Sequence, residues 1–397
     1  MNNETNKLIP ELRFPEFAND GNWEEEIIEN IAKAESSSIA LNKLELKKEG
    51  YPVYGADSIV GFIESYQHEH NYISIVKDGS GVGRLNLCKS KSSILGTLVA
   101  IKAKDNKKYN LNWIYYLLSS IDFSSYIKGS GIPHIYYSDY KNENVFVPNQ
   151  DEQQKIASCL SSLDELITAH TNKLETLKTY KKGLMQNLFP QEGEKVPKLR
   201  FKEFEKDGEW SEDKLGNIGN PSMCKRIFKE ETTSDSINGI PFYKIGTFGK
   251  QADSYISKEI YEEYKSKYSF PKNGEILISA SGTIGRLVVY DGEPAFFQDS
   301  NIVWISNDES KVKNKFLYYV YSLLNWQTSD GGIIQRLYNA NLKGMVISYP
   351  ENSKEQQKIA NTLSSLDNLI KEQSTKIEQL KSHKKGLMQG LFPKVNN

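Results

Sequence analysis

The sequence predicts an α+β fold in which two small domains are joined by two long helices that form an antiparallel coiled coil. Three observations predict it. Whole segments of the first half recur almost unchanged in the second half, each recurring frame contains a heptad pattern, and the stretches between the frames differ. A chain that repeats its frame and varies the rest has internal pseudo-two-fold symmetry and presents two different surfaces on one scaffold.

The repeated frame consists of three segments that appear in the same order in both halves. They are PELRFPEFANDGNW (10–23) with PKLRFKEFEKDGEW (197–210), EQQKIASCLSSLDELI (152–167) with EQQKIANTLSSLDNLI (355–370), and KKGLMQNLFP (181–190) with KKGLMQGLFP (384–393). These repeats divide the chain into a first domain, a first helix, a second domain with a short leading linker and a second helix. The expected boundaries are 1–150, 151–190, 191–350 and 351–397.

The two predicted helices carry matching heptad seams. Side chains spaced alternately by three and four residues form each seam, as expected for a coiled coil: Ile156, Leu160, Leu163, Ile167, His170, Leu174 and Leu177, and then Ile359, Leu363, Leu366, Ile370, Gln373, Ile377 and Leu380. Equal seams in one chain most simply pair with each other, and a pseudo-two-fold makes the pair antiparallel. His170 and Gln373 then form a polar layer that fixes the register. The alternative is that each helix packs only on its own domain.

Breaks in the helical pattern mark where the two helices begin and end. Strand-like runs closed by Pro148 and Pro350 precede the helices. Gly183 and Gly386 are expected to interrupt the helices late, before Pro190 and Pro393 stop them.

Composition narrows the class of protein. Charged residues are 25% and hydrophobic residues 38%, as in soluble globular proteins. No apolar run approaches the ~20 residues that cross a bilayer, and the N-terminus has no apolar signal region. The three cysteines show no metal-ligand spacing, so neither a disulfide framework nor a metal site is expected. These features predict a cytoplasmic protein, whose net charge of −1 gives no overall attraction to nucleic acid.

Between the frames, both halves mix strands with one clear helix. The helix at 109–121 corresponds to the one at 312–324. The expected strands 71–76 and 275–280 lead into the glycine-rich turns GSGVGRL (79–85) and SGTIGRL (281–287). Neither turn continues into Gly-Lys-Ser/Thr, and the first lacks the third glycine of a dinucleotide fingerprint, so nucleotide binding is excluded. Each turn instead brings amides, a hydroxyl and an arginine to one surface, although a purely structural turn remains the alternative.

A second pair of glycine-containing loops also recurs, KGSGIPHIYY (128–137) and SDGGIIQRLYN (329–339). Their His134, Gln335 and Arg336 are groups that can reach base edges or phosphates. The sequence YISKEIYEEYKSKYSF (255–270) has no clear counterpart in the first half.

Catalytic motifs are missing from the sequence. His68, Glu69 and His70 lack the spacing of a zincin site, so this cluster is interpreted as solvated surface. There is no nucleophile elbow, no kinase motif set and no Asn/Asp-Pro-Pro-Tyr/Phe motif of amino-methyltransferases. The chain is therefore expected not to be an enzyme.

The repeated helices, the LRF-x-EF openings and the SGTIGR and GSGIPHI turns resemble the DNA-specificity (S) subunit of type I restriction–modification systems. The resemblance covers almost the whole chain. It implies two α/β target-recognition domains with mixed or antiparallel sheets, each reading one half of a bipartite site in double-stranded DNA, spaced by the coiled coil. It also implies two modification subunits that bind S-adenosylmethionine and methylate adenine, and restriction subunits that cleave DNA. This chain itself is expected to carry no cofactor and no metal.

Residues on the turns and loops are the predicted DNA contacts. They are Tyr54, Asp57, Lys77, Ser80, Arg84 and His134 in the first domain, and Tyr243, Lys244, Ser281, Thr283, Arg286, Gln335 and Arg336 in the second. Because the two sets differ, the DNA site is expected to be asymmetric. Two other functions stay open: a coiled-coil scaffold that binds proteins without DNA sequence preference, and a fused methyltransferase or nuclease.

Overall fold

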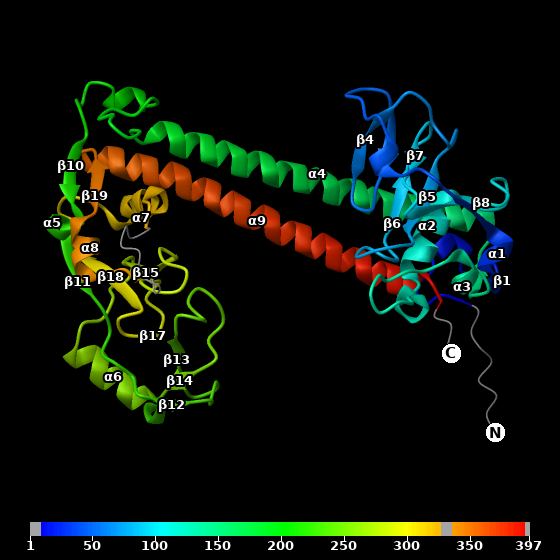
Figure 1. Cartoon of the computed structure of the whole chain (residues 1–397). Coiled ribbons are helices and arrows are strands. Elements are labelled where there is room, and N and C mark those ends of the chain that lie inside the picture. Colours follow the sequence, from blue (N-terminus) through cyan, green and yellow to red (C-terminus); the bar gives the residue numbers. More distant parts are fainter. Residues whose placement is uncertain (1–8, 327–335, 394–397) are drawn as a thin grey trace. The chain divides into compact units, whose positions relative to one another are not determined.

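The computed structural model describes residues 9–326 and 336–393, and the chain divides into two compact units. The first unit comprises the chain up to Leu174 together with the segment from Gln373 onward, and the second runs from Glu175 to Glu372. Each unit therefore contains one predicted domain, the beginning of one long helix and the end of the other. Figure 1 labels most of the helices and strands of both units.

Strands and short helices of the first domain precede the long helix α4. The strands are β1 (Glu24–Ile27), β2 (Ala32–Ser36), β3 (Tyr51–Tyr54), β4 (Ile59–Ile63), β5 (Tyr72–Val76), β6 (Leu85–Cys88), β7 (Ser93–Ile94), β8 (Leu98–Ala103) and β9 (Asn144–Val147). The helices are η1 (Pro15–Phe17), α1 (Ile28–Ile31), η2 (Leu41–Lys43), α2 (Leu111–Ser120), η3 (Phe123–Tyr126), α3 (Tyr137–Tyr140) and α4 (Gln150–Leu188). The expected helix at 109–121 and strand at 71–76 are confirmed as α2 and β5.

Corresponding elements follow in the second domain, before the long helix α9. The strands are β10 (Ser211–Lys214), β11 (Gly219–Ser222), β12 (Thr232–Thr233), β13 (Ile240–Tyr243), β14 (Tyr255–Ile256), β15 (Ile276–Ser279), β16 (Leu287–Val289), β17 (Phe296–Phe297), β18 (Ile302–Asn307) and β19 (Val346–Tyr349). The helices are η4 (Lys202–Phe204), α5 (Leu215–Ile218), η5 (Lys229–Glu231), α6 (Lys258–Lys267), α7 (Asn314–Leu323), α8 (Asn339–Gly344) and α9 (Ser353–Leu391). Helix α6 lies in the stretch that has no clear counterpart in the first half.

The sheets of the two domains have matching strand orders. The main antiparallel sheet is β2-β8-β5-β6 in the first domain and β11-β18-β15-β16 in the second. A smaller mixed sheet contains the parallel pair β3-β7 or β13-β17. The strands β1 and β10 pair with β9 and β19, which lead directly into the long helices. The expected mixture of antiparallel and mixed sheets is therefore confirmed.

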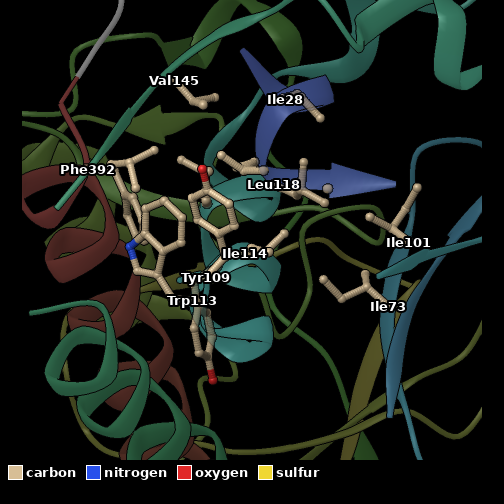
Figure 2. Packing of buried hydrophobic residues seen from close by; sticks show 14 of the residues in the cluster. Ile28, Ile73, Ile101, Tyr109, Trp113, Ile114, Leu118, Val145 and Phe392 are labelled. Atoms are coloured by element: carbon tan, nitrogen blue, oxygen red, sulfur yellow. The ribbon is translucent and has the colours of Figure 1, made fainter. Parts of the chain in front are cut away.

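Each domain buries its own core between the main sheet and its helix. In the first unit, Trp113 and Ile114 of α2 and Ile73 and Ile101 of the sheet are fully buried together (Figure 2). Phe392, just after α9, packs on the same cluster, with ring centroids 6.4 Å from Trp113. The side chain of Asn110 caps α2 by accepting the backbone N–H of Trp113 at 3.0 Å. The core therefore joins the domain to the end of α9.

The long helices begin and end almost where the prolines predict, but the glycines do not interrupt them. Both α4 and α9 continue through Gly183 and Gly386 to Leu188 and Leu391. The expected interruption is therefore wrong. A glycine costs only about 1 kcal/mol inside a helix, which packing along the rest of the helix offsets. None of the helices within the described ranges is long and apolar enough to cross a membrane.

The long helices α4 and α9 pack together within each unit. In the first unit, Lys384 of α9 contacts Asp164 of α4, and Gln373 of α9 contacts His170 of α4. As the residue number rises along α4, the number of the contacting residue on α9 falls, so these segments are antiparallel. In the second unit, Lys181 of α4 is ion-paired with Asp367 of α9.

Candidate nucleic-acid interface

The glycine-rich turn of the first domain is a tight loop between β5 and β6. Gly83 donates its N–H to the carbonyl of Val76 at 2.9 Å, and Arg84 donates its N–H to Gly81 at 3.0 Å. Gly79 and Gly83 have φ of 99° and 84°, a region that favours glycine. Lys77, Ser80 and Arg84 are therefore presented on one short turn.

The loop that carries His134 is bound along this turn. The N–H of Gly79 donates to Pro133 and the N–H of Ile135 donates to Lys77, both at 2.9 Å. The loop is closed on itself because His134 and Lys128 exchange backbone hydrogen bonds of 2.8 and 2.9 Å. The structure thus brings His134 to the turn with Lys77, Ser80 and Arg84.

The hairpin formed by β3 and β4 brings the carboxylate of Asp57, but not the hydroxyl of Tyr54, to the turn that carries Arg84. Asp57 forms an ion pair with the guanidinium of Arg84. Tyr54 lies on the same hairpin, but its hydroxyl oxygen accepts the N–H of Lys89 at 3.4 Å, after the far end of β6. We call Asp57 with residues 77–84 and 128–135 the first loop cluster.

In the second domain, the turn after β15 repeats this arrangement. Ser281 and Arg336 form an isolated antiparallel β-bridge. Next to it, Leu337 donates its N–H to the carbonyl of Ala280 at 2.8 Å. The loop that carries Arg336 thus pairs with the turn that carries Ser281, as the loop that carries His134 pairs with the glycine-rich turn of the first domain. Gln335 lies outside the described residues.

Arg286 links this turn to the loop after β13. Its Nη1 donates to the carbonyl of Phe248 at 2.9 Å, and its backbone N–H donates to Oγ of Ser279 at 2.8 Å. A guanidinium has five donors, so one bond to Phe248 leaves donors for another acceptor. Gly285, with φ of 82°, has no room for a side chain, because a Cβ there would lie 2.3 Å from Trp326.

Two predicted DNA contacts of the second domain, Tyr243 and Lys244, interact with other residues of that domain. The Tyr243 ring stacks on Phe297 with centroids 5.8 Å apart. The ammonium of Lys244 lies 2.9 Å from Oδ1 of Asp253. The hydroxyl of Ser279 donates a hydrogen bond to the carbonyl of Thr283, which stabilises the turn.

A short turn that the sequence did not indicate connects these loops. In the second domain it runs from Gln298 to Asn301, between β17 and β18. Oδ1 of Asn301 accepts the hydroxyl of Ser281 at 2.9 Å, and the carbonyl of Ser300 accepts Nη2 of Arg336 at 2.8 Å. Oε1 of Gln298 accepts the N–H of Ile245 at 2.9 Å. We call residues 243–249, 281–286 and 298–301 with Arg336 the second loop cluster.

The first domain has the same connecting turn with different side chains. Residues 95–97 lie between β7 and β8, and the carbonyl of Thr97 accepts the N–H of Lys77 at 2.9 Å. Leu95 donates its N–H to Tyr54 at 3.0 Å, as Gln298 does to Tyr243 at 2.9 Å. Only the sheet pairing reveals this turn, because it contains no recurring sequence motif.

A repeated contact joins each domain to both long helices. In the first unit, the hydroxyl of Tyr116 on α2 donates to Oδ2 of Asp164 on α4 at 2.7 Å, and Nζ of Lys384 on α9 donates to the same oxygen at 2.7 Å. The Lys384 ammonium also lies 5.1 Å from the centroid of the Tyr116 ring. Burial raises the pKa of the Tyr116 hydroxyl, which keeps it a donor.

The second unit repeats this contact with the helices exchanged. Tyr319 on α7 donates to Oδ2 of Asp367 on α9 at 2.8 Å, and Lys181 on α4 is ion-paired with that carboxylate. The Lys181 ammonium lies 5.5 Å from the centroid of the Tyr319 ring. We call the two triads, Tyr116–Asp164–Lys384 and Tyr319–Asp367–Lys181, the anchor triads.

Buried polar side chains hold the beginning of each long helix. Gln153 accepts the N–H of Asn110 at 2.9 Å and donates to the carbonyl of Pro148 at 3.0 Å. Gln356 makes the matching bonds to Lys313 and Pro350, each at 2.8 Å.

Paired arginine and glutamate side chains add a second matched attachment. Arg13 binds both carboxylate oxygens of Glu152, and Arg200 binds both of Glu355, at distances of 2.7 to 2.8 Å. The LRF-x-EF openings are therefore explained, because their arginine ties the start of each domain to its helix.

The predicted seam positions are the shielded positions of the long helices. Ile156, Leu160, Ile359 and Leu363 are buried in the domain cores. The remaining predicted seam residues are buried or half-buried, while most of their helical neighbours are exposed. They are Leu163, Ile167, His170, Leu174, Leu177, Leu366, Ile370, Gln373, Ile377 and Leu380.

His170 and Gln373 meet within the first unit. Nε2 of Gln373 donates to the carbonyl of His170 at 2.9 Å and also contacts Nδ1 of its ring.

The interpretation of His68 as solvated surface is wrong. His68 is only 5% exposed, its ring packs on Tyr72 with centroids 4.2 Å apart, and Nδ1 lies 3.6 Å from Oε2 of Glu35. An antiparallel bridge to Ser92, which is remote in sequence, carries it inward. Burial lowers the pKa of His68; the nearby Lys102 lowers it further, and Glu35 opposes both effects.

The described residues offer donors and acceptors for recognition. Within residues 9–326 and 336–393, no three His, Cys, Asp or Glu side chains gather as a metal site would require. Burial raises the pKa of the Cys88 and Cys224 thiols, which disfavours the thiolate form. The loop clusters instead present arginine, lysine, histidine and hydroxyl groups, the groups that contact phosphates and base edges in protein–DNA complexes.

Comparison with known proteins agrees with this arrangement. The family model of the type I restriction modification DNA specificity domain matches twice, at residues 20–179 and 207–382. The chain belongs to this family, whose specificity subunits recognise DNA and are not catalytic.

Two relatives match most of the chain, and one solved structure matches nearly all of it. The Haemophilus influenzae specificity subunit S.HindORF215P is 38% identical over 86% of this chain and 85% of its own length. The MjaVIII specificity subunit of Methanocaldococcus jannaschii is 28% identical over 80% of this chain and 77% of that protein. The crystal structure of an S subunit from M. genitalium has a TM-score of 0.71 at 18% identity, covering 98% of this chain and 100% of that chain. It shows a shared fold.

Proposed function

We propose that each domain reads one half of an asymmetric, bipartite site in double-stranded DNA through its loop cluster. One observation carries this proposal: the two units share matching attachments to the long helices, whereas their loop clusters differ. Arg336 occupies the position in the second domain that His134 occupies in the first. The turn arginines also have different partners, since Arg286 donates to the carbonyl of Phe248, whereas Arg84 is ion-paired with Asp57. A shared frame with different loops is what two different half-sites require.

The predicted DNA contacts remain part of this proposal. Lys77, Ser80, Arg84, His134 and Asp57 belong to the first loop cluster, and Tyr243, Lys244, Ser281, Thr283, Arg286 and Arg336 to the second. Tyr54 and Gln335 are retained on sequence grounds alone. We further propose that 1–150 and 191–350 act as the recognition segments, and that the helices at 151–190 and 351–397 set the gap between half-sites.

Partner subunits complete the proposed assembly. Two modification subunits would bind S-adenosylmethionine and methylate adenine within the site, and restriction subunits would cleave unmodified DNA in the cytoplasm. The net charge of −1 supports a shared DNA interface, since phosphate contacts need clustered cations that partners can supply. We therefore expect weak DNA binding by the isolated chain and salt-sensitive, sequence-specific binding by its complex with modification subunits.

A binding assay tests this proposal. The complex with modification subunits is titrated onto its natural site and onto sites with either half scrambled. Loss of affinity in both scrambled sites, by different amounts, is expected. Equal affinity for all three DNAs would instead favour a scaffold without sequence preference, and tight specific binding by the isolated chain would contradict the role of the partners.

A further inference from the structure

The segment that follows β11, residues 223–229, exposes basic and apolar side chains beside the second loop cluster. Lys225, Arg226 and Lys229 are all exposed. Met223 is 43% exposed and Phe228 is 51% exposed, so apolar side chains flank the cations. The predicted DNA contacts include none of these residues.

Several contacts hold this segment in a fixed position. Cys224 is 3% exposed and anchors it in the domain. Nε of Arg226 donates to Oδ2 of Asp299 at 2.9 Å, and the hydroxyl of Ser300 lies 3.7 Å from the sulfur of Met223. Asp299 and Ser300 belong to the turn that connects the second loop cluster. The segment is therefore continuous with the proposed reading surface.

The cations remain accessible, since the Arg226 side chain is 61% exposed even though it is ion-paired with Asp299. Nζ of Lys225 lies 5.0 Å from the centroid of the Tyr268 ring, a contact that keeps its charge at the surface. Glu231, which follows the segment, is turned toward the domain, because it accepts the N–H of Phe228 at 2.7 Å and the hydroxyl of Tyr264 at 2.6 Å. Glu230 is the exposed carboxylate next to the cations.

The first domain has no such charge at the corresponding positions. Strand β11 pairs with β18 as β2 pairs with β8, with Gly219 opposite Asn307 and Ala32 opposite Ala103. This register aligns the three cations with uncharged residues, which are Ser38, Ile39 and Asn42. The segment after β2 also touches its connecting turn, since Ile39 accepts the N–H of Gly96 at 2.7 Å. The position is thus shared, but the three cations at these positions are specific to the second domain.

We propose that residues 223–229 form a clamp on the DNA phosphate backbone beside the half-site read by the second domain. This inference rests on the proposed function and adds to it a phosphate-binding surface whose three cations have no charged counterpart at the aligned positions of the first domain. Exposed cations next to base-reading loops bind phosphates and so fix the register of the protein on the duplex. They contribute affinity that does not depend on sequence and that salt weakens.

The test removes the three charges together in the complex with modification subunits. The variant K225Q/R226Q/K229Q is compared with K198Q/K202Q/K206Q, which removes three exposed lysines from the chain leading into the same domain. Each lost phosphate contact lowers the slope of log K against log salt by ~0.9. We expect the clamp variant to lose about 2 to 3 from this slope, with equal weakening on specific and scrambled DNA. The control variant should keep the wild-type slope.

Four further results separate the possible outcomes. Retention of the slope by K225R/R226K/K229R supports the clamp, because this variant keeps the charges. A clamp variant with an unchanged slope, while the wild-type complex still prefers its site, overturns the clamp and leaves the proposed function standing. Loss of the modification subunits by the clamp variant on size-exclusion chromatography would make the segment a protein-docking surface and also overturn the clamp. A wild-type complex without site preference overturns the proposed function itself.

Discussion

Tyr116 donates a hydrogen bond of 2.7 Å to Asp164, and this bond connects the helix of the first domain with the long helix α4. Lys384 of α9 binds the same carboxylate, so one aspartate joins three helices. Asp367 does the same in the second unit with Tyr319 and Lys181. Each aspartate therefore adds one shared contact point to the other attachments that hold a domain on both long helices.

The anchor triads predict effects confined to one half-site. Asp164→Asn should lower stability by about 1 kcal/mol, because the ion pair is only partly shielded. It should also weaken recognition of the half-site of the first domain, and Asp367→Asn should do so at the other. Binding to DNAs with one half scrambled measures this, with exposed Glu165→Gln as the control. Equal effects of both variants at both half-sites would contradict the triads as local anchors.

The contact between His170 and Gln373 predicts a trade of stability for register. A polar layer in a coiled coil costs stability and excludes shifted alignments. The double variant His170→Leu/Gln373→Leu should therefore unfold at a higher temperature, with a gain of about 1 kcal/mol or more. It should also accept DNA gaps next to the preferred one. A raised melting temperature with an unchanged gap preference would rule out the register role.

The two turn arginines predict separable losses of recognition. Arg286→Ala should weaken binding to the half-site of the second domain about tenfold to a hundredfold, equivalent to ~1–3 kcal/mol, and leave the other half-site intact. Arg84→Ala should do the converse. Binding to DNAs with one half scrambled measures both effects, and Arg286→Lys tests whether charge alone suffices, since lysine cannot make the paired contacts of arginine. Loss at both half-sites from either variant would point to a scaffold defect instead.

His68 predicts acid sensitivity of the first domain. Its pKa is lowered in the folded protein, so below the unfolded value of ~6.5 the unfolded chain binds the proton more readily. Stability should therefore be fully present above about pH 6.5 and decline as the pH falls from there toward the lower folded pKa. His68→Phe should flatten this decline in chemical unfolding at pH 7 and pH 5, whereas exposed His70→Gln should not. Parallel profiles for wild type and His68→Phe would exclude His68 as the cause.

Periodic and repeated features of this fold were predictable, whereas long-range pairings were not. The heptads predicted α4 and α9, and the matched tyrosine-rich segments predicted α2 and α7, because a local pattern specifies a helix. The turns at 95–97 and 298–301 were missed, because only the pairing of distant strands brings them to the loop clusters. The sequence does not indicate the burial of His68 for the same reason, since its β-bridge to Ser92 joins residues that are distant in the chain.

The candidate site was predictable to a similar extent. Glycine-rich turns identified both loop clusters, because tight turns need glycine at positive φ. Sequence did not reveal that Arg84 and Arg286 are each held by a neighbouring loop, nor that residues 223–229 lie beside the second cluster. Those relationships depend on tertiary contacts that no local motif encodes.

Mapping methylated bases by single-molecule sequencing, in host cells with and without this gene, shows whether two unlike domains read two half-sites. We expect a two-part motif with unlike halves and a fixed gap, which disappears when the gene is deleted. Restoring the gene with Arg286→Ala should bring back a motif that is relaxed in one half only. An unchanged methylation pattern after deletion, or loss of a single uninterrupted motif, would contradict the claim that two unlike domains read two half-sites.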